Sequence, residues 1–253
     1  MNSDNPELSI VIPAYNEELR IGRTLSRIQE YFKNGPRATT ALEVIVVDDG
    51  STDGTARIAQ QWAATDCEGE FRLLSNNGNR GKGYSVRRGM LEARGRIALF
   101  TDADLSAPIE ESEKLFAAIA AGKDIAIGSR AIDRSLISVR QSIFRETAGI
   151  IFNGFVRLLT GLPLHDTQCG FKAFVREPCR IIFEQQRIEG FGFDPEVLFL
   201  ARRHGLRTAE VPVRWAHDPA TKVHVFRDSF LMFADLVWIR WNWLLGRYPV
   251  KRP

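Results

Sequence analysis

Acidic residues gather at two places where a run of apolar residues ends. The stretch VIVVDDGSTDGT passes from four apolar residues directly to Asp48 and Asp49, and FTDADLS places Asp102 and Asp104 after a second such run. Carboxylates that lie close together repel one another unless they hold a cation or bind a ligand through hydrogen bonds. Oxygen ligands suit Mg²⁺ or Mn²⁺, which commonly bridge protein carboxylates to substrate phosphates. The pattern predicts a divalent-metal site if the fold brings these segments together.

Each motif alone also fits a structural role. Aspartate, serine and glycine are favoured at turns and helix starts, so DDGSTDGT could simply cap a helix. The stretch GNRGKGYSVRRG has the spacing of neither a P-loop nor a dinucleotide-binding loop. Its Lys82 and Arg87 could offset the charge of a diphosphate, or could be solvated bases at a helix start. Because PAYNE adds Glu17 after a third apolar run, the three segments together favour ligand binding.

The elements that must position these residues follow from the apolar pattern. Five predicted strands alternate with four predicted helices; the strands are residues 8–15, 42–49, 71–76, 96–104 and 124–130, and the helices 16–32, 55–64, 82–93 and 109–121. This alternation predicts a largely parallel sheet that helices cover on both faces. Such sheets bind ligands at the carboxyl ends of their strands, so the acidic segments should meet at one edge.

The second half of the chain has a different character. A long amphipathic helix is predicted over residues 142–159, with Phe144, Ala148, Ile151, Phe152, Phe155 and Leu159 on one stripe. A loop over residues 161–174 enters a short strand, a loop and helix follow at 191–205, and a strand at 207–215. Asp194 and Glu196 beside Pro195 indicate a helix start, where acids suit the helix dipole. We expect a catalytic domain over 1–225, then an amphipathic aromatic helix and basic tail over 226–253.

Composition excludes some classes of protein. The chain has 253 residues, a net charge of +3 and three cysteines without CxxC spacing. The charge is too small to argue for nucleic acid, so we expect no nucleic-acid partner. An odd number of unpaired-looking cysteines and the lack of a signal-peptide pattern favour a reduced, cytoplasmic setting. Because no 18-residue apolar stretch occurs, we expect no segment that spans a bilayer.

The motifs, taken in order, resemble a known family. IVIPAYNEE, VIVVDDGSTDGT, GKGYSVRRGM, FTDADLSAP and IAIGSR resemble the signatures of family 2 inverting glycosyltransferases with the GT-A fold. The later DTQCGFKAF and VPVRW are similar to those of polyprenyl-phosphate hexosyltransferases: dolichyl-phosphate glucosyltransferases, dolichyl-phosphate mannosyltransferases and bacterial undecaprenyl-phosphate enzymes. The resemblance covers residues 8–242 and implies an α/β fold of the GT-A type, Rossmann-like, with a mostly parallel central sheet.

The resemblance also implies roles for individual residues. The nucleotide sugar is expected to contact Pro13, Tyr15, Glu17, Val47, Asp49, Asp102 and Ala103. The metal, Mg²⁺ or Mn²⁺, is expected at Asp102 and Asp104, with Ser106 in its shell. Some members have glutamine where this chain has Ser106, a weaker ligand that can act through water, and this departure leaves the metal preference open.

Basic residues complete the expected site. Arg130 of GSR and Lys222 after the VPVRW strand are expected to meet phosphate, with Arg214 and Lys82 as helpers. Positive charge near the departing nucleoside diphosphate would stabilise the transition state.

The acceptor side carries the remaining candidates. A lipid phosphate is already anionic, so its attack does not strictly need a strong general base. Asp166 could orient the donor sugar or the second phosphate, or could cap a turn before Thr167, and Gln168 is similarly ambiguous. We expect Asp104, Arg130 and Asp166 to be the catalytic residues. Cys169 has no recognisable histidine partner and is expected to be a structural thiol.

The expected reaction is transfer of glucose from UDP-glucose to a polyprenyl phosphate, dolichyl or undecaprenyl, because DTQCGFKAF looks closer to the glucosyl members. GDP-mannose is the close alternative donor, since hexoses differ by only a few hydrogen bonds. Transfer to a polysaccharide or soluble acceptor is a second alternative. A non-catalytic nucleotide-sugar binding module is a third, which the intact DAD with Arg130 and Lys222 disfavours.

Two helices are expected to reach a membrane surface, residues 142–159 and 226–245. The second carries Trp238, Trp241 and Trp243 and ends in the basic GRYPVKRP, which suits an interfacial helix. The alternative is packing on the sheet or on a second subunit. We expect a peripheral protein on the cytoplasmic face of a membrane, drawn there by anionic lipid. A homo-oligomer or a separate membrane-anchor partner is also open.

Overall fold

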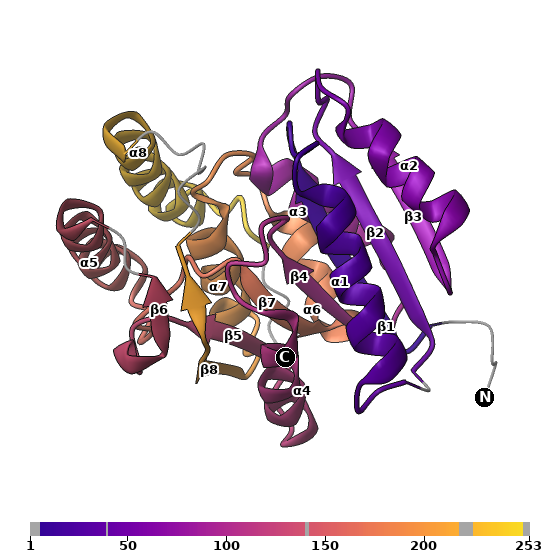
Figure 1. Cartoon of the computed structure of the whole chain (residues 1–253). Helices are drawn as coiled ribbons and strands as arrows, with labels where there is room; N and C mark the ends of the chain where they lie inside the picture. Colours follow the sequence, from indigo (N-terminus) through magenta and orange to yellow (C-terminus); the bar gives the residue numbers. More distant parts are fainter. Residues whose placement is uncertain (1–5, 39, 140–141, 218–224, 250–253) are drawn as a thin grey trace.

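A seven-stranded sheet organises the chain. The computed structural model describes residues 6–38, 40–139, 142–217 and 225–249, and Figure 1 shows their arrangement. The strand order is β3-β2-β1-β4-β7-β5-β8, and only β7 runs antiparallel to its neighbours. The strands are β1 (Leu8–Ala14), β2 (Leu42–Asp48), β3 (Glu70–Ser75), β4 (Ile97–Thr101), β5 (Ile125–Ser129), β7 (Phe171–Val175) and β8 (Thr208–Pro212). A second, two-stranded sheet pairs β6 (Ile137–Val139) with β9 (Trp215–Ala216). The predicted, largely parallel sheet is confirmed.

Helices cover both faces of the sheet, as expected. One face packs against α1 (Ile21–Asn34), α2 (Thr55–Thr65) and α4 (Ser112–Ala120), and the core on the other face includes α3 (Lys82–Glu92), α6 (Arg176–Gln185) and α7 (Phe193–Arg203). Helices α5 (Ile143–Thr160) and α8 (Val225–Leu244) join this second core and pack against each other and against α7. Short 3₁₀ helices occur at Ile109–Glu111 and Arg134–Leu136. Helix α1 buries Ile21, Leu25, Ile28 and Phe32, the stripe that the sequence spacing predicts.

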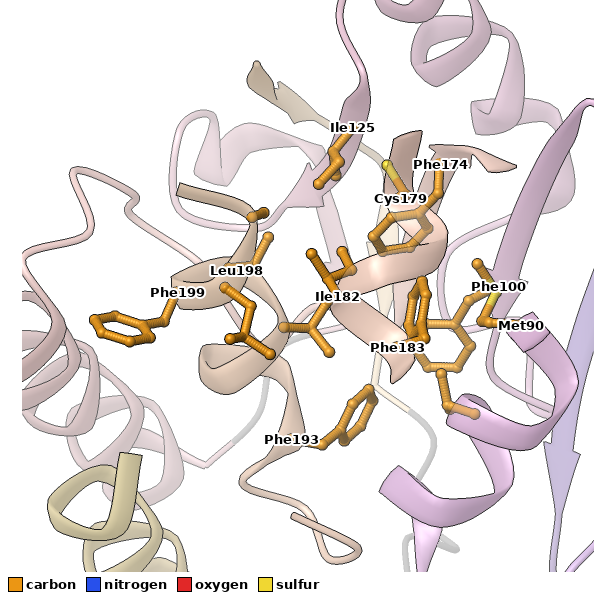
Figure 2. Close-up of a cluster of buried hydrophobic side chains, with 14 of the residues drawn as sticks. Met90, Phe100, Ile125, Phe174, Cys179, Ile182, Phe183, Phe193, Leu198 and Phe199 are labelled. Atoms are coloured by element: carbon orange, nitrogen blue, oxygen red, sulfur yellow. The ribbon is translucent and has the colours of Figure 1, made fainter. Parts of the chain in front are cut away.

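The core on the second face is rich in aromatic side chains. Figure 2 shows Phe100, Phe183 and Phe193 pointing toward one another from β4, α6 and α7. The rings of Phe100 and Phe193 lie 6.0 Å apart at 65°, an edge-to-face contact. Burying each such side chain stabilises the fold by about 1.5 to 3 kcal/mol. Strand β4, which ends in the DAD motif, is therefore firmly packed.

Helix α6 has no counterpart among the predicted elements. It contains Pro178, but the proline lies in the first turn, where its missing N–H costs no hydrogen bond. The helix buries Cys179, Ile182 and Phe183.

The stripe predicted for α5 is wrong in part. The helix buries Phe152, Val156 and Thr160, whereas Ile151 and Phe155 are 57% and 40% exposed. The reason is that α5 packs along α8 and α7, not flat on the sheet, so a narrower strip is covered. Phe144 belongs to residues whose side chains the structure does not describe.

Helix α8 shares the core with the rest of the chain. It buries Met232, Leu236 and Ile239, and it lies beside α5 at the left of Figure 1. The division of the chain at residue 226 thus stays a prediction. Within the described residues, no helix combines the length and apolar character needed to cross a bilayer.

Candidate active site

The ends of three neighbouring strands meet at one edge of the sheet. Strand β1 lies between β2 and β4 and runs parallel to both, with Ala14 level with Asp48 and Val11 level with Phe100. The segments that follow these strands, PAYNE, DDGS and DAD, therefore share the carboxyl edge, as the sequence predicts. This edge is the candidate active site.

The second aspartate of DDGS organises the glycine-rich loop. Asp49 accepts hydrogen bonds from the backbone N–H of Arg80 at 3.0 Å and of Gly81 at 2.8 Å, and from Asn76 Nδ2 at 2.7 Å. Asp48 accepts from the Ser51 N–H at 3.3 Å. The two adjacent carboxylates thus fix the two turns that follow β2 and β3. In this structure Asp49 shapes the pocket, and its expected contact with the base stays a prediction.

The glycine-rich loop delivers Lys82 to the DAD motif. The Lys82 ammonium lies 2.6 Å from Asp102 Oδ1. Gly81 adopts φ +103°, and a Cβ there would lie 2.5 Å from the Glu189 carbonyl oxygen, so only glycine fits. Burial alone would lower the pKa of Lys82, but the charges of Asp102 and Asp194 outweigh it and raise that pKa. Lys82 is therefore a fixed positive charge beside the metal-ligand candidates.

The DAD loop has an unusual backbone. Leu105 takes φ +48° and Asn16, after β1, takes φ +54°, both in the left-handed region that costs a residue such as leucine about 1 kcal/mol or more. The turn lets the Ser106 N–H donate to Asp104 Oδ1 at 2.8 Å. Burial and the neighbouring charge of Asp102 raise the pKa of Asp104.

These two aspartates fit a divalent cation. Burial and the charge of Asp102 both raise the pKa of Asp104, and a bound cation would offset both effects. In the described part of the chain no group of three or more His, Cys, Asp or Glu side chains is arranged to hold a metal. The wider carboxylate cluster expected from the sequence does not form, because Asp48 and Asp49 bond to their own loops. Phosphate and water oxygens would have to complete the shell, as is common for Mg²⁺.

Arg130 and Asp166 form the second charged pair of the site. Asp166 accepts from Arg130 Nε at 2.6 Å, from Nη2 at 2.8 Å and from the Arg130 N–H at 3.0 Å. Burial would raise the pKa of Asp166, but Arg130 holds it down to about 2. A carboxylate this acidic is a poor general base at neutral pH. Asp166 orients Arg130, whose guanidinium also lies 5.3 Å from the Trp215 ring centroid.

The direction of strand β7 brings the loop before it to the DAD motif. Because β7 is antiparallel to β4, its first residue Phe171 is level with Thr101, and Gly170 reaches the DAD motif. The Asp102 N–H donates to the Gly170 carbonyl at 3.2 Å. A Cβ on Gly170 would lie 1.9 Å from Asp102 Oδ2, so the carboxylate fills the space that glycine leaves.

Other predicted site residues lie at the same edge in varied settings. Tyr15 is 37% exposed and Pro13 is half-buried, and Glu17 Oε2 lies 2.8 Å from Arg20 Nε. Ala103 is buried, and its carbonyl accepts from Thr24 Oγ1 at 2.5 Å. Val47 is fully buried in the core and offers no surface to a ligand in this structure.

The remaining predicted residues contact other groups or fall outside the described residues. The Arg214 guanidinium pairs with Glu111 at 2.5 Å, so its charge is already engaged. Gln168 Nε2 lies 3.8 Å from the Met232 sulfur of α8. Lys222 falls outside the described residues.

Three functional carboxylates and a lysine were not singled out as site residues from the sequence. Glu210 of β8 accepts from the backbone N–H groups of His165 and Asp166, and so fixes the loop that carries Asp166. Glu111 holds Arg214, and Asp194 pairs with the buried Lys172. The available signal was a lysine within the apolar strand GFKAF, because a buried lysine needs an acidic partner.

Comparison with known proteins agrees with this geometry. Residues 9–183 match the family model described as Glycosyl transferase family 2. The chain is 36% identical to the dolichyl-phosphate beta-glucosyltransferase of Dictyostelium discoideum, over 98% of this chain and 78% of that protein. It is 38% identical to the enzyme of the same name from Drosophila melanogaster, over 98% and 79%.

The fold is also found among solved structures. Glucosyl-3-phosphoglycerate synthase from Mycobacterium tuberculosis, crystallised with Mn²⁺ and UDP-glucose, superposes with a TM-score of 0.63 at 19% identity, covering 98% of this chain and 80% of that one. At this identity the likeness shows the shared GT-A fold alone. The family match and the relatives go further: the chain belongs to glycosyltransferase family 2, and it is a glycosyltransferase.

Proposed function

We propose that this enzyme transfers a hexose from a nucleotide sugar to a polyprenyl phosphate, with UDP-glucose as donor and dolichyl or undecaprenyl phosphate as acceptor. The observation that carries the proposal is the pair of cations, Lys82 and Arg130, that flank the two DAD carboxylates at one sheet edge. Asp102 lies near enough to both to raise the pKa of each. Such a site suits a diphosphate, which needs cations on more than one side. The names of the relatives support glucose and dolichyl phosphate.

The donor side follows from this charge arrangement. Asp102 and Asp104 would hold Mg²⁺ or Mn²⁺, which when bound supplies positive charge against the departing diphosphate. Lys82 and Arg130 stay protonated at neutral pH and stabilise the negative charge that grows as the sugar–phosphate bond breaks. Tyr15, which directly follows β1 and is exposed, would contact the nucleotide.

The acceptor reaction needs little proton transfer. An oxygen of the lipid phosphate attacks C1 of the hexose, the bond from C1 to the diphosphate oxygen breaks with its electron pair, and the configuration at C1 inverts. The attacking oxygen is already ionised, so no general base is required. This agrees with Asp166 being committed to Arg130, with a pKa of about 2. An acceptor with a hydroxyl nucleophile would need a general base, a role that Asp166 does not fit.

A donor and acceptor panel tests the proposal. The purified protein is incubated with Mn²⁺ or Mg²⁺, dolichyl phosphate, and UDP-glucose or GDP-mannose, and lipid-linked sugar is measured. We expect transfer from UDP-glucose, a loss of about 100-fold in Asp104→Asn, and little change in Glu43→Gln. Glu43 is a matched control because it is a buried, arginine-paired carboxylate at the opposite end of β2.

The outcomes separate the alternatives. Transfer from GDP-mannose alone would keep the mechanism and replace the sugar. Donor hydrolysis without lipid product would contradict the polyprenyl acceptor and favour a polysaccharide or soluble one. Full turnover in Asp104→Asn would contradict the role of the DAD carboxylates.

We further propose that α5 and α8 face a membrane, on its cytoplasmic side. These helices, together with the residue that follows α8, expose many large apolar side chains: Ile150, Ile151, Phe155, Leu158, Phe230, Leu231, Phe233, Val237, Trp238, Trp241, Leu244 and Leu245. The Phe155 and Phe233 rings lie 5.1 Å apart, so the two helices form one surface. An apolar patch of this kind marks an interaction site, and its tryptophans with Arg247 nearby suit the lipid headgroup region. A lipid acceptor would reach the enzyme at this surface of α5 and α8.

Vesicle flotation tests this surface. The protein is mixed with phosphatidylcholine vesicles with and without phosphatidylglycerol, at low and high salt. We expect binding that increases with anionic lipid and decreases in Phe230→Ser with Trp241→Ser, but not in Leu19→Ser, whose side chain is 84% exposed elsewhere. Absence of binding together with a concentration-dependent dimer would instead assign the surface to a second copy of the chain.

A further inference from the structure

A lysine is buried beneath the candidate site. Lys172 on β7 is 2% exposed, and its ammonium donates to the Cys169 carbonyl and to Asp194 Oδ1, both at 2.5 Å. Asp194 is 5% exposed and belongs to the first turn of α7. A buried ion pair is often no more stabilising than apolar residues of similar size. Stability alone therefore does not explain why this ion pair is buried here, and its position next to the site indicates a role in that site.

The lysine holds the segment that shapes Asp102. Its partner, the Cys169 carbonyl, directly precedes Gly170. The Gly170 carbonyl accepts from the Asp102 N–H at 3.2 Å, and the Asp102 carboxylate occupies the space where a Gly170 side chain would be. A shift of the Cys169–Gly170 peptide would move Asp102.

Asp194 also interacts with Lys82, the cation beside Asp102. The ammonium groups of Lys82 and Lys172 lie 5.5 and 5.8 Å from the centroid of the same ring, Phe100, so both cations lie close to it. Asp194 forms an ion pair with Lys172, and its negative charge also acts on Lys82. Two ion pairs, Asp102 with Lys82 and Asp194 with Lys172, thus lie beside the same Phe100 ring.

We propose that Lys172 and Asp194 are a positioning pair for the metal- and diphosphate-binding groups: Lys172 fixes the peptide that shapes Asp102, and Asp194 balances the charge of Lys82. The inference rests on the proposed function and adds two residues to it. Neutralising Asp194 leaves an excess positive charge near Asp102, which opposes a metal ion and favours a phosphate. Neutralising Lys172 leaves an excess negative charge, which opposes a phosphate, and it frees the peptide that shapes Asp102, which disturbs the metal-ligand candidates.

Direct binding measurements distinguish this role from a structural one. Mn²⁺ binding is measured from the paramagnetic resonance signal of free Mn²⁺, and UDP binding without metal by calorimetry, in Asp194→Asn and Lys172→Met. We expect Asp194→Asn to weaken Mn²⁺ binding on the order of tenfold and to retain UDP binding. Lys172→Met should weaken UDP binding by a similar factor, because it leaves an excess negative charge, and should also weaken Mn²⁺ binding, because it frees the peptide that shapes Asp102. Lys172→Arg should stay near wild type, and Glu43→Gln, remote from the site, should change neither.

Retained UDP binding in Asp194→Asn beside weakened UDP binding in Lys172→Met is the decisive result, because loss of folded protein would weaken UDP binding in both variants. Equal changes of UDP binding in the two variants, or wild-type Mn²⁺ and UDP binding in both, would overturn the inference. If the single variants do not fold, the double variant Lys172→Met/Asp194→Asn leaves no lone buried charge. It should then show lower turnover at little changed donor KM, and wild-type turnover in the folded double variant would overturn the inference.

The same measurements separate this inference from the proposed function. Wild-type protein that binds Mn²⁺ and UDP but transfers nothing to dolichyl phosphate would contradict the acceptor and leave the positioning pair intact. Wild-type protein that binds neither would overturn both.

Discussion

Replacing Asp166 by asparagine tests the charged pair that orients Arg130. Asparagine keeps the shape of the side chain but cannot offset the guanidinium. The pKa of about 2 for Asp166, against 3.8 for a free aspartate, corresponds to about 2.4 kcal/mol, since each pKa unit is worth about 1.4 kcal/mol. Arg130 keeps 28% of its side chain exposed and can be partly rehydrated. We therefore expect Asp166→Asn to lower the free energy of unfolding by about 2 kcal/mol at pH 7.

The loss of stability in Asp166→Asn should depend on pH in the direction that the lowered pKa of Asp166 sets. A carboxyl whose pKa is lowered by folding stabilises the protein above the pKa of the unfolded state, and that stabilisation is lost as the pH falls toward the folded pKa. The difference between wild type and Asp166→Asn should thus be full above about pH 4 and shrink between about pH 4 and pH 2.

Urea unfolding followed by tryptophan fluorescence, repeated from pH 7 to pH 2.5, measures this difference. A matched control is Glu30→Gln, which removes a surface pair with Arg27 and should cost about 0.5 kcal/mol or less at every pH. A difference between wild type and Asp166→Asn that is absent at pH 7, or that does not change below pH 4, would refute the reasoning. Turnover should also fall in Asp166→Asn, because Arg130 is then free to leave its position.

Three further predictions concern other parts of the molecule. Gly170→Ala should lower Mn²⁺ affinity and turnover on the order of tenfold with little change in melting temperature, because its Cβ would displace the Asp102 carboxylate; a wild-type Mn²⁺ titration would contradict this. Arg214→Ala should leave UDP affinity unchanged, because its charge pairs with Glu111, and should cost about 1 kcal/mol or less in urea unfolding, because the Arg214 side chain is exposed and Lys114 still pairs with the buried Glu111; weakened UDP binding would support a role of Arg214 at the phosphate site. Iodoacetamide at pH 8 should label Cys67 first, because burial raises the pKa of the Cys169 and Cys179 thiols to about 12. Mass spectrometry would follow the labelling, and early labelling of Cys169 or Cys179 would contradict their burial.

Much of the fold could be read from the sequence because its pattern is local. The spacing of Ile21, Leu25, Ile28 and Phe32 requires a helix with one buried face, and the structure has it. Alternating strands and helices require a mostly parallel sheet, and parallel strands place their carboxyl ends at one edge. The motifs after β1, β2 and β4 were bound to meet for that reason.

The sequence by itself thus determined the sheet, its active edge and the family, but only the tertiary structure decided which charges pair. Asp166 binds Arg130 across 36 residues, and Arg214 binds Glu111 across 103, partners that no local spacing relates. The antiparallel entry of β7 beside β4 brings Gly170 to Asp102 and buries Lys172 against Asp194. The physical reason is range: apolar periodicity acts over one helix or strand, whereas the energy of a charge depends on every group packed around it in the folded chain.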